Sequence, residues 1–120
     1  MDSYDKAQQL AKALANSEEY QQFTRAKEKV EEDESNMSLL QEFRRRQLEL
    51  QMSQITGEEV DEEQVEQVEQ MYQMLSLNKN INEYLNAEYR LSRLMSDIQK
   101  IIGDAVKDWF EFGERESSLN

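Results

Sequence analysis

Proline is absent from this chain of 120 residues, and glycine occurs only three times. These two residues most often interrupt helices, because proline lacks an amide hydrogen and glycine loses more backbone entropy on folding than other residues. Gly57 and Gly113 mark the clearest breaks between helix-forming stretches. Glu, Gln, Ala, Leu, Arg, Lys and Met dominate the remainder, and all of them favour helix. No run of alternating β-branched residues is present, so the sequence predicts an all-α fold.

Apolar residues recur at three- and four-residue steps, which places them on one face of each expected helix. This periodicity favours a folded chain even though 33% of the residues are charged. We expect a helical bundle of about five helices, over residues 3–15, 17–33, 37–54, 62–77 and 80–112. The expected N-caps are Asn16, then Ser35 or Asn36, then Asp61, and finally Asn80.

The last expected helix has the longest apolar stripe, with heptad-like spacing from Tyr84 to Trp109. At 1.5 Å per residue it would be roughly 48 Å long, whereas a compact domain of this size is roughly 35 Å across. The four shorter helices would leave part of the stripe uncovered. We therefore expect a homodimer or higher symmetric assembly through the long helices, including the helix over 37–54. The alternative is a monomer whose last helix bends or breaks at Gly103 and folds back.

Arg44, Arg45 and Arg46 form the one basic cluster. Consecutive helical positions differ by about 100°, so the three side chains cannot share one direction. With a net charge of −12, direct nucleic-acid binding would face repulsion. Ion pairs to acidic neighbours, or to an acidic patch of a partner, are favoured instead. The candidate protein-interaction residues are Phe43, Arg44, Arg45, Leu91, Met95, Ile98, Ile102, Trp109 and Phe110.

Histidine and cysteine are both absent, which excludes disulfides, zinc sites with His or Cys ligands, thiolate-held clusters and triads based on His or Cys. The carboxylates over residues 58–69 lack the spacing of a calcium loop, and no phosphate loop or nucleophile elbow occurs. We predict no enzymatic activity, no cofactor and no metal site. The sequence also lacks a secretory signal and an apolar stretch of membrane-spanning length, so a cytoplasmic location without membrane attachment is expected.

Four stretches together resemble the bacterial YlbF/YmcA family, and the third makes the YheA-like branch the closest match. They are SEEYQQF from Ser17, EFRRRQLELQ from Glu42, GEEVDEEQV from Gly57 and AEYRLSRLMSDIQKII from Ala87. The resemblance implies a small helical protein that self-associates through long helices. It also implies an accessory regulator in a complex with ribonuclease Y, linked to mRNA processing, competence, sporulation and biofilm formation. The iron-sulfur clusters of some relatives depend on cysteines that this chain lacks.

We expect a single domain over residues 1–113, followed by a polar tail over 114–120. Its expected function is that of a non-enzymatic regulatory or adaptor protein, which acts through contacts with other proteins. The alternative is an RNA-associated factor that binds nucleic acid directly.

Overall fold

A computed structural model describes residues 2–111, and every regular element in that range is helical. The helices are α1 (Ser3–Ala15), α2 (Glu18–Glu31), α3 (Glu34–Thr56), α4 (Glu62–Leu77) and α5 (Lys79–Ala105). A further helical segment covers residues 107–111. The predicted all-α class, with about five helices and a long helix near the C-terminus, is confirmed.

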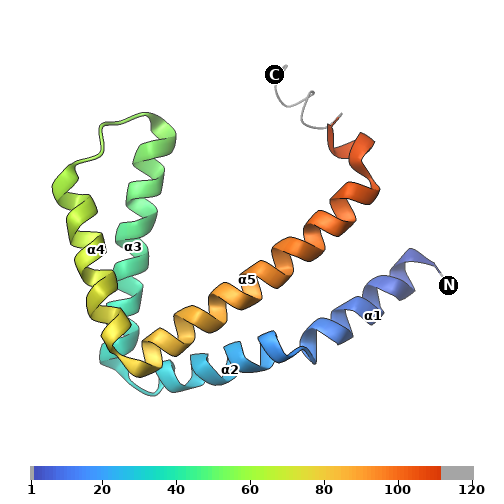
Figure 1. Cartoon of the computed structure of the whole chain (residues 1–120), viewed down its shortest axis with the longest axis horizontal. Coiled ribbons are helices and arrows are strands. Elements are labelled where there is room, and N and C mark those ends of the chain that lie inside the picture. The colour runs from blue at the N-terminus through green and yellow to red at the C-terminus, as the bar shows by residue number, and fades with distance from the viewer. Residues whose placement is uncertain (1, 112–120) are drawn as a thin grey trace.

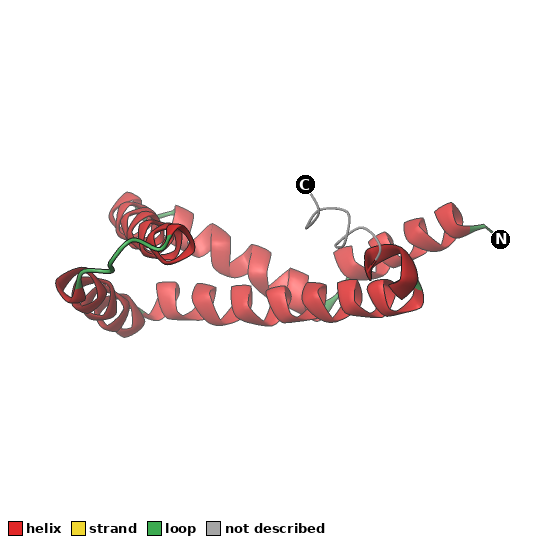
Figure 2. Cartoon of the chain, turned by 90° about the horizontal axis from the view of Figure 1, so that it is seen from above, coloured by secondary structure: helices red, strands yellow, loops and turns green. Residues whose placement is uncertain are grey.

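The helices form two arms that meet at one end and diverge, which gives the molecule the shape of a V (Figure 1). One arm is the antiparallel hairpin of α3 and α4. The other consists of α5, with α2 packed along its first half and α1 extending beyond. Seen from above, the arms form a thin molecule (Figure 2), with extents of 48 × 40 × 17 Å. Its Cα radius of gyration is 18.8 Å, whereas a compact domain of this length would have about 14 Å.

The hydrophobic core lies where the two arms meet, a region called the vertex below. Four helices contribute its buried apolar side chains, which are Ala26, Val30, Leu40, Phe43, Leu75, Ile81, Tyr84 and Ala87. Phe23 packs against this core, with its ring centroid 5.5 Å from that of Tyr84. Within residues 2–111, α1 contains no buried side chain, and α3 contains none after Phe43. The far halves of both arms are therefore held by much less burial than the vertex.

The helix starts follow capping chemistry, but three of the expected caps were wrong. Ser17 rather than Asn16 caps α2, and its hydroxyl accepts a hydrogen bond from the Tyr20 amide. Asp33 caps α3, in place of Ser35 or Asn36.

Asn78 caps α5, two residues before the expected Asn80, whereas Asp61 caps α4 as predicted. Each error lies within a few residues because neighbouring Ser, Asn and Asp side chains compete for the same role. Gly57 ends α3 with φ of 78°, a conformation that a residue without a Cβ adopts at no steric cost.

Helix α5 ends at Ala105, several residues before the expected end at residue 112. Its 27 residues correspond to roughly 40 Å of helix. The helix does not break at Gly103, which lies within it. Instead the ring of Phe110 packs beside Gly103, at a distance where an added Cβ would make ordinary van der Waals contact with it. Residue 112, Gly113 and the expected tail over 114–120 lie outside the described residues.

Candidate protein-interaction surface

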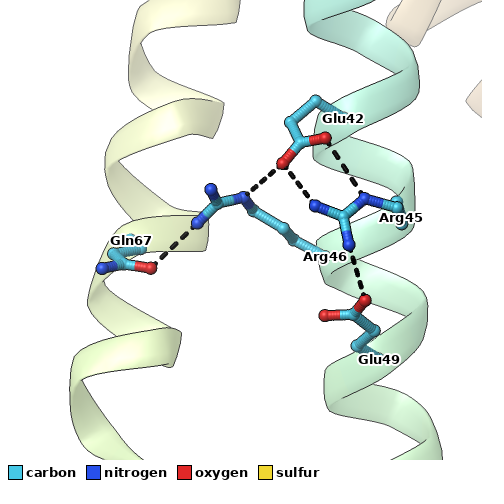
Figure 3. Close-up of polar contacts among 5 residues, drawn as sticks. All are labelled: Glu42, Arg45, Arg46, Glu49 and Gln67. Atoms are coloured by element: carbon cyan, nitrogen blue, oxygen red, sulfur yellow. Dashed lines mark hydrogen bonds and ion pairs between the residues drawn. The ribbon is translucent and has the colours of Figure 1, made fainter.

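The arginine cluster on α3 is organised by Glu42, which accepts hydrogen bonds from two of the three arginines (Figure 3). The Glu42 Oε1 atom lies 2.6 Å from Arg45 Nη2 and 2.9 Å from Arg46 Nε. Arg45 also pairs with Glu49 at 2.8 Å, and Arg46 donates to Gln67 of α4 at 2.9 Å. Hydrogen bonds from Arg45 and then Arg46 lower the pKa of Glu42 to about 2. The cluster therefore carries its own counter-charges and ties α3 to α4.

Arg44 has a different role, because it joins the two arms at the vertex. Its guanidinium forms an ion pair with Glu88 of α5 and lies 5.6 Å from the centroid of the Tyr84 ring. The Tyr84 hydroxyl donates a hydrogen bond to the same Glu88 carboxylate at 3.0 Å. Burial is the main cause that raises the pKa of Tyr84, while the charge of Arg44 opposes that rise. Arg44 and Arg45 thus both have partners within the chain.

Phe43 is not available to a partner in this structure. It was a candidate contact residue, but only 5% of it is exposed, and it belongs to the core. Its position one residue before the arginine cluster suggested a surface role. However, the vertex encloses its side chain, and its ring faces that of Tyr72 at a centroid distance of 6.0 Å.

The expected stripe on α5 runs from a covered half to an uncovered half. Leu91 and Ile98 are half-buried, and Met95 is 37% exposed. Further along, Ile102 is 51% exposed. The exposure arises because α2 ends its contact with α5 near the middle of α5, and α1 makes no extended contact with the remainder. In Figure 1, α1 runs roughly parallel to the far half of α5 and apart from it.

Two aromatic residues end the uncovered half of the stripe. Trp109 is 70% exposed, and Phe110 is also exposed although one edge of its ring faces Gly103. Their ring centroids are 5.0 Å apart in an edge-on arrangement. Sequence spacing placed Trp109 in register with Ile102, but the end of α5 at Ala105 interrupts that register.

A second uncovered apolar face was not among the candidate residues. On α3, Leu48, Met52 and Ile55 are 59%, 54% and 80% exposed. These residues continue a helix whose apolar positions surround much of its circumference, a pattern that indicates contacts on two sides. The periodicity could have located this face, but not which of the two sides the hairpin would leave uncovered.

The described part of the chain offers little chemistry beyond protein contacts. Residues 2–111 contain no group of three or more acidic side chains arranged to hold a metal ion. A hollow of about 380 Å³ lies at the base of the V, with Phe43, Tyr72 and Tyr89 among its walls. None of the described helices combines the length and apolar character that crossing a membrane requires.

These features define a class, namely small all-α proteins built as an open pair of helical arms with broad uncovered apolar faces. A family model described as "Control of competence regulator ComK, YlbF/YmcA" matches residues 3–107. The chain belongs to this YlbF/YmcA family, as its resemblance had indicated.

Relatives from bacteria share most of the chain. A UPF0342 protein of Caldicellulosiruptor bescii is 43% identical over 104 residues, which are 87% of each chain. A UPF0342 protein of Desulfitobacterium hafniense is 39% identical over 113 residues, which cover 94% of this chain and 91% of that one.

Solved structures share the fold. A protein of unknown function (DUF964) from Bacillus stearothermophilus has a TM-score of 0.75 at 26% identity, covering 87% of this chain and 91% of that one. The yheA protein from Bacillus subtilis has a TM-score of 0.63 at 25% identity, covering 90% and 98%. Bacillus subtilis RicA, solved in complex with RicF, matches at 0.57 and 22% identity, covering 88% and 93%.

Proposed function

We propose that this protein is a non-enzymatic regulatory adaptor that acts by presenting helical faces to other protein chains, including copies of itself. One observation carries this proposal. Among the described residues, the large apolar side chains that remain exposed outnumber those buried in the core. Contiguous exposed apolar surface on a small protein is typical of interaction sites. The separated arms supply such surface without any change of fold.

Self-association is proposed to use the far half of α5. Leu91, Met95, Ile98 and Ile102 form a seam of heptad-like spacing, and Trp109 and Phe110 add exposed apolar surface beyond the end of α5. Aromatic side chains and Met are enriched at protein interfaces, and Trp often contributes a large share of the binding energy when a partner covers it. The proposed assembly is a symmetric dimer, or a higher assembly built from it.

Analytical ultracentrifugation of the full chain at micromolar concentration tests this self-association. We expect a dimer or larger species, and we expect Ile102→Glu to convert it to a monomer, because a buried unpaired carboxylate is costly. Leu77→Glu is a matched control, because Leu77 is 87% exposed at the vertex end of α4. A wild-type protein that sediments as a monomer would refute this part of the proposal.

The finer role is proposed on the family resemblance. We propose that the adaptor acts in a complex linked to ribonuclease Y and to the control of mRNA processing, competence, sporulation or biofilm formation. The family description, "Control of competence regulator ComK", supports a regulatory role. RicA, which shares this fold, was solved in complex with another protein, RicF. The experiment is co-purification of ribonuclease Y with the tagged chain, and failure of wild-type protein to retain it would contradict this role.

Direct RNA binding was the alternative, and its test is retention of RNA by the purified protein. The described arginines of the 44–46 cluster are paired with acidic or amide partners, and the net charge of −12 opposes phosphate. We expect no salt-dependent retention. Tight retention that weakens steeply with salt would favour the alternative over the adaptor.

A further inference from the structure

The α3 stripe, defined as Leu48, Met52 and Ile55, faces the open side of the V. At about 100° per residue, these three side chains fall within about 60° of one another around the helix. Their shared direction is opposite to that of Arg46 and Leu50, which face α4. Figure 1 shows α3 on the side of the hairpin nearer α5, so a direction away from α4 points into the V. The stripe therefore lies on an inner wall of the V, on a different arm from the α5 seam.

The arm that carries the stripe is strongly negative. Residues 47–78 contain no lysine or arginine, and their acidic residues are Glu49, Glu58, Glu59, Asp61, Glu62, Glu63, Glu66 and Glu69. In the described structure only Glu49 of this set forms an ion pair with a basic side chain. The stripe ends at Ile55. Glu58 and Glu59 follow in the loop, three and four residues later. An apolar stripe thus leads into a region whose carboxylates have no internal counter-charge.

We propose that the α3 stripe binds an amphipathic helix of a different protein, one that is rich in lysine or arginine. This inference rests on the proposed adaptor function and names the partner chemistry of one face. Apolar side chains at i, i+3 or i+4, and i+7 of the partner would cover Leu48, Met52 and Ile55. Basic side chains flanking them would meet the carboxylates of the hairpin, which would also steer association.

Charge argues against a second copy of this chain as the occupant. Each copy carries a net charge of −12, so a second copy brings like charge to the arm. The far half of α5 does not supply the opposite charge. Residues 90–111 contain equal numbers of basic and acidic side chains, namely Arg90, Arg93, Lys100 and Lys107 against Asp97, Asp104, Asp108 and Glu111. A basic partner would therefore complement the charge of the acidic hairpin, whereas residues 90–111 of a second copy would not.

The test uses two fluorescent synthetic peptides of identical leucine and lysine content, added to the full-length protein. One arranges leucine at helical spacing, and the other is scrambled so that it forms no apolar face. Fluorescence anisotropy is expected to show at least tenfold tighter binding of the amphipathic peptide. Leu48→Gln with Met52→Gln should weaken that binding about tenfold. Met74→Gln with Leu77→Gln is the matched control, because these apolar side chains are also exposed, at 67% and 87%, but lie on α4, and it should leave binding unchanged.

Electrostatic complementarity is tested with Glu58→Gln combined with Glu59→Gln. We expect this variant to bind the amphipathic peptide several-fold more weakly and with a shallower salt dependence, because fewer carboxylates face the lysines. Circular dichroism checks that each variant remains helical. If the double substitution at Leu48 and Met52 unfolds the chain, Ile55→Gln alone replaces it, since Ile55 is 80% exposed.

Several outcomes would overturn the proposal. Equal binding of both peptides, or equal binding by the stripe variant and the control, would reduce the interaction to non-specific charge attraction. Loss of self-association in the stripe variant, with peptide binding unchanged, would assign the stripe to a second copy. The Ile102→Glu variant separates this inference from self-association, because it should change the sedimenting mass while peptide binding persists. Failure of self-association alone therefore leaves the stripe proposal standing.

Discussion

Glu42 is the residue on which the arginine cluster depends, because it accepts hydrogen bonds from both Arg45 and Arg46. These donors bind the charged carboxylate and not its protonated form, so they hold its pKa at about 2, against 4.5 ordinarily. An acid whose pKa is lower in the folded state stabilises that state above its unfolded pKa. This stabilisation is lost as the pH falls from about 4.5 through about 2.

A carboxyl-detected NMR titration of Glu42 checks this shift, and it should give a midpoint near 2 in the wild-type chain. The double variant Arg45→Gln, Arg46→Gln should move the midpoint upward, toward 4.5. Glu42→Gln identifies the signal, because it removes the titrating group. A wild-type midpoint near 4.5, or no change in the double variant, would contradict the hydrogen-bonded arrangement in Figure 3.

At the residue scale, the sequence predicts ion pairs between neighbouring residues but not contacts between residues far apart in the chain. The divergence of Arg44, Arg45 and Arg46 follows from helical geometry, and the pairing of Arg45 and Arg46 follows from the nearby glutamates. The contact between Arg44 and Glu88 joins residues 44 positions apart, and no local pattern encodes it. The burial of Phe43 has the same origin, since only the packing of four helices encloses it.

Asn78 is the single residue between α4 and α5, and it has three structural roles. It ends α4, its Oδ1 atom caps α5 by accepting from the Ile81 amide at 3.1 Å, and its Nδ2 atom donates to Asn36 at 3.0 Å. Asn36 is the buried polar residue of the core region. This one side chain therefore positions both arms at the vertex.

Asn78→Ala should lower the free energy of unfolding by about 2–3 kcal/mol, through loss of the cap and of the donor to the Oδ1 atom of the buried Asn36. Urea denaturation followed by circular dichroism measures this change. Asn80→Ala is the matched control and should alter stability by less than about 0.5 kcal/mol, because Asn80 lies inside α5 and caps nothing. A larger loss of stability for Asn80→Ala than for Asn78→Ala would indicate that Asn80 caps α5, as the sequence predicts.

Most helix boundaries could be predicted, because apolar spacing and turn residues are local signals. Helix α1 has the predicted bounds, and α4 ends at the predicted Leu77. The end of α5 was missed because helix-forming residues continue past Ala105 and nothing in their spacing marks a stop. There the ring of Phe110 turns back onto Gly103, which is a tertiary contact.

For the whole molecule, the divergence of the arms is the feature that composition and periodicity could not supply. The angle depends on side chains that meet only at the vertex, such as Leu40, Leu75 and Ile81. The sequence did indicate that one chain would not cover all of its apolar residues. It located part of the uncovered surface on α5 and included the helix over 37–54 in the expected assembly. It did not name the stripe residues, because apolar side chains surround much of α3.

Small-angle X-ray scattering of the Ile102→Glu variant tests the open shape. If this variant is monomeric, its radius of gyration should be close to or above 18.8 Å, rather than the roughly 14 Å of a compact domain. The wild-type protein measured beside it shows how assembly changes the value. A variant value near 14 Å would mean that the arms close on one another in solution.

Because Asn78 is the one residue between α4 and α5, a small rotation at the vertex would be enlarged along the hairpin. Helix α4 has 16 residues and is therefore roughly 24 Å long, so a rotation of roughly 10° about its vertex end displaces the far tip by roughly 4 Å. Such a displacement approaches one helical turn, while the core near the pivot moves by only a fraction of it. A small rotation at the vertex therefore becomes a larger displacement at the tip of the hairpin. A ligand that binds the tip would act on the contacts at the vertex over the whole length of α4.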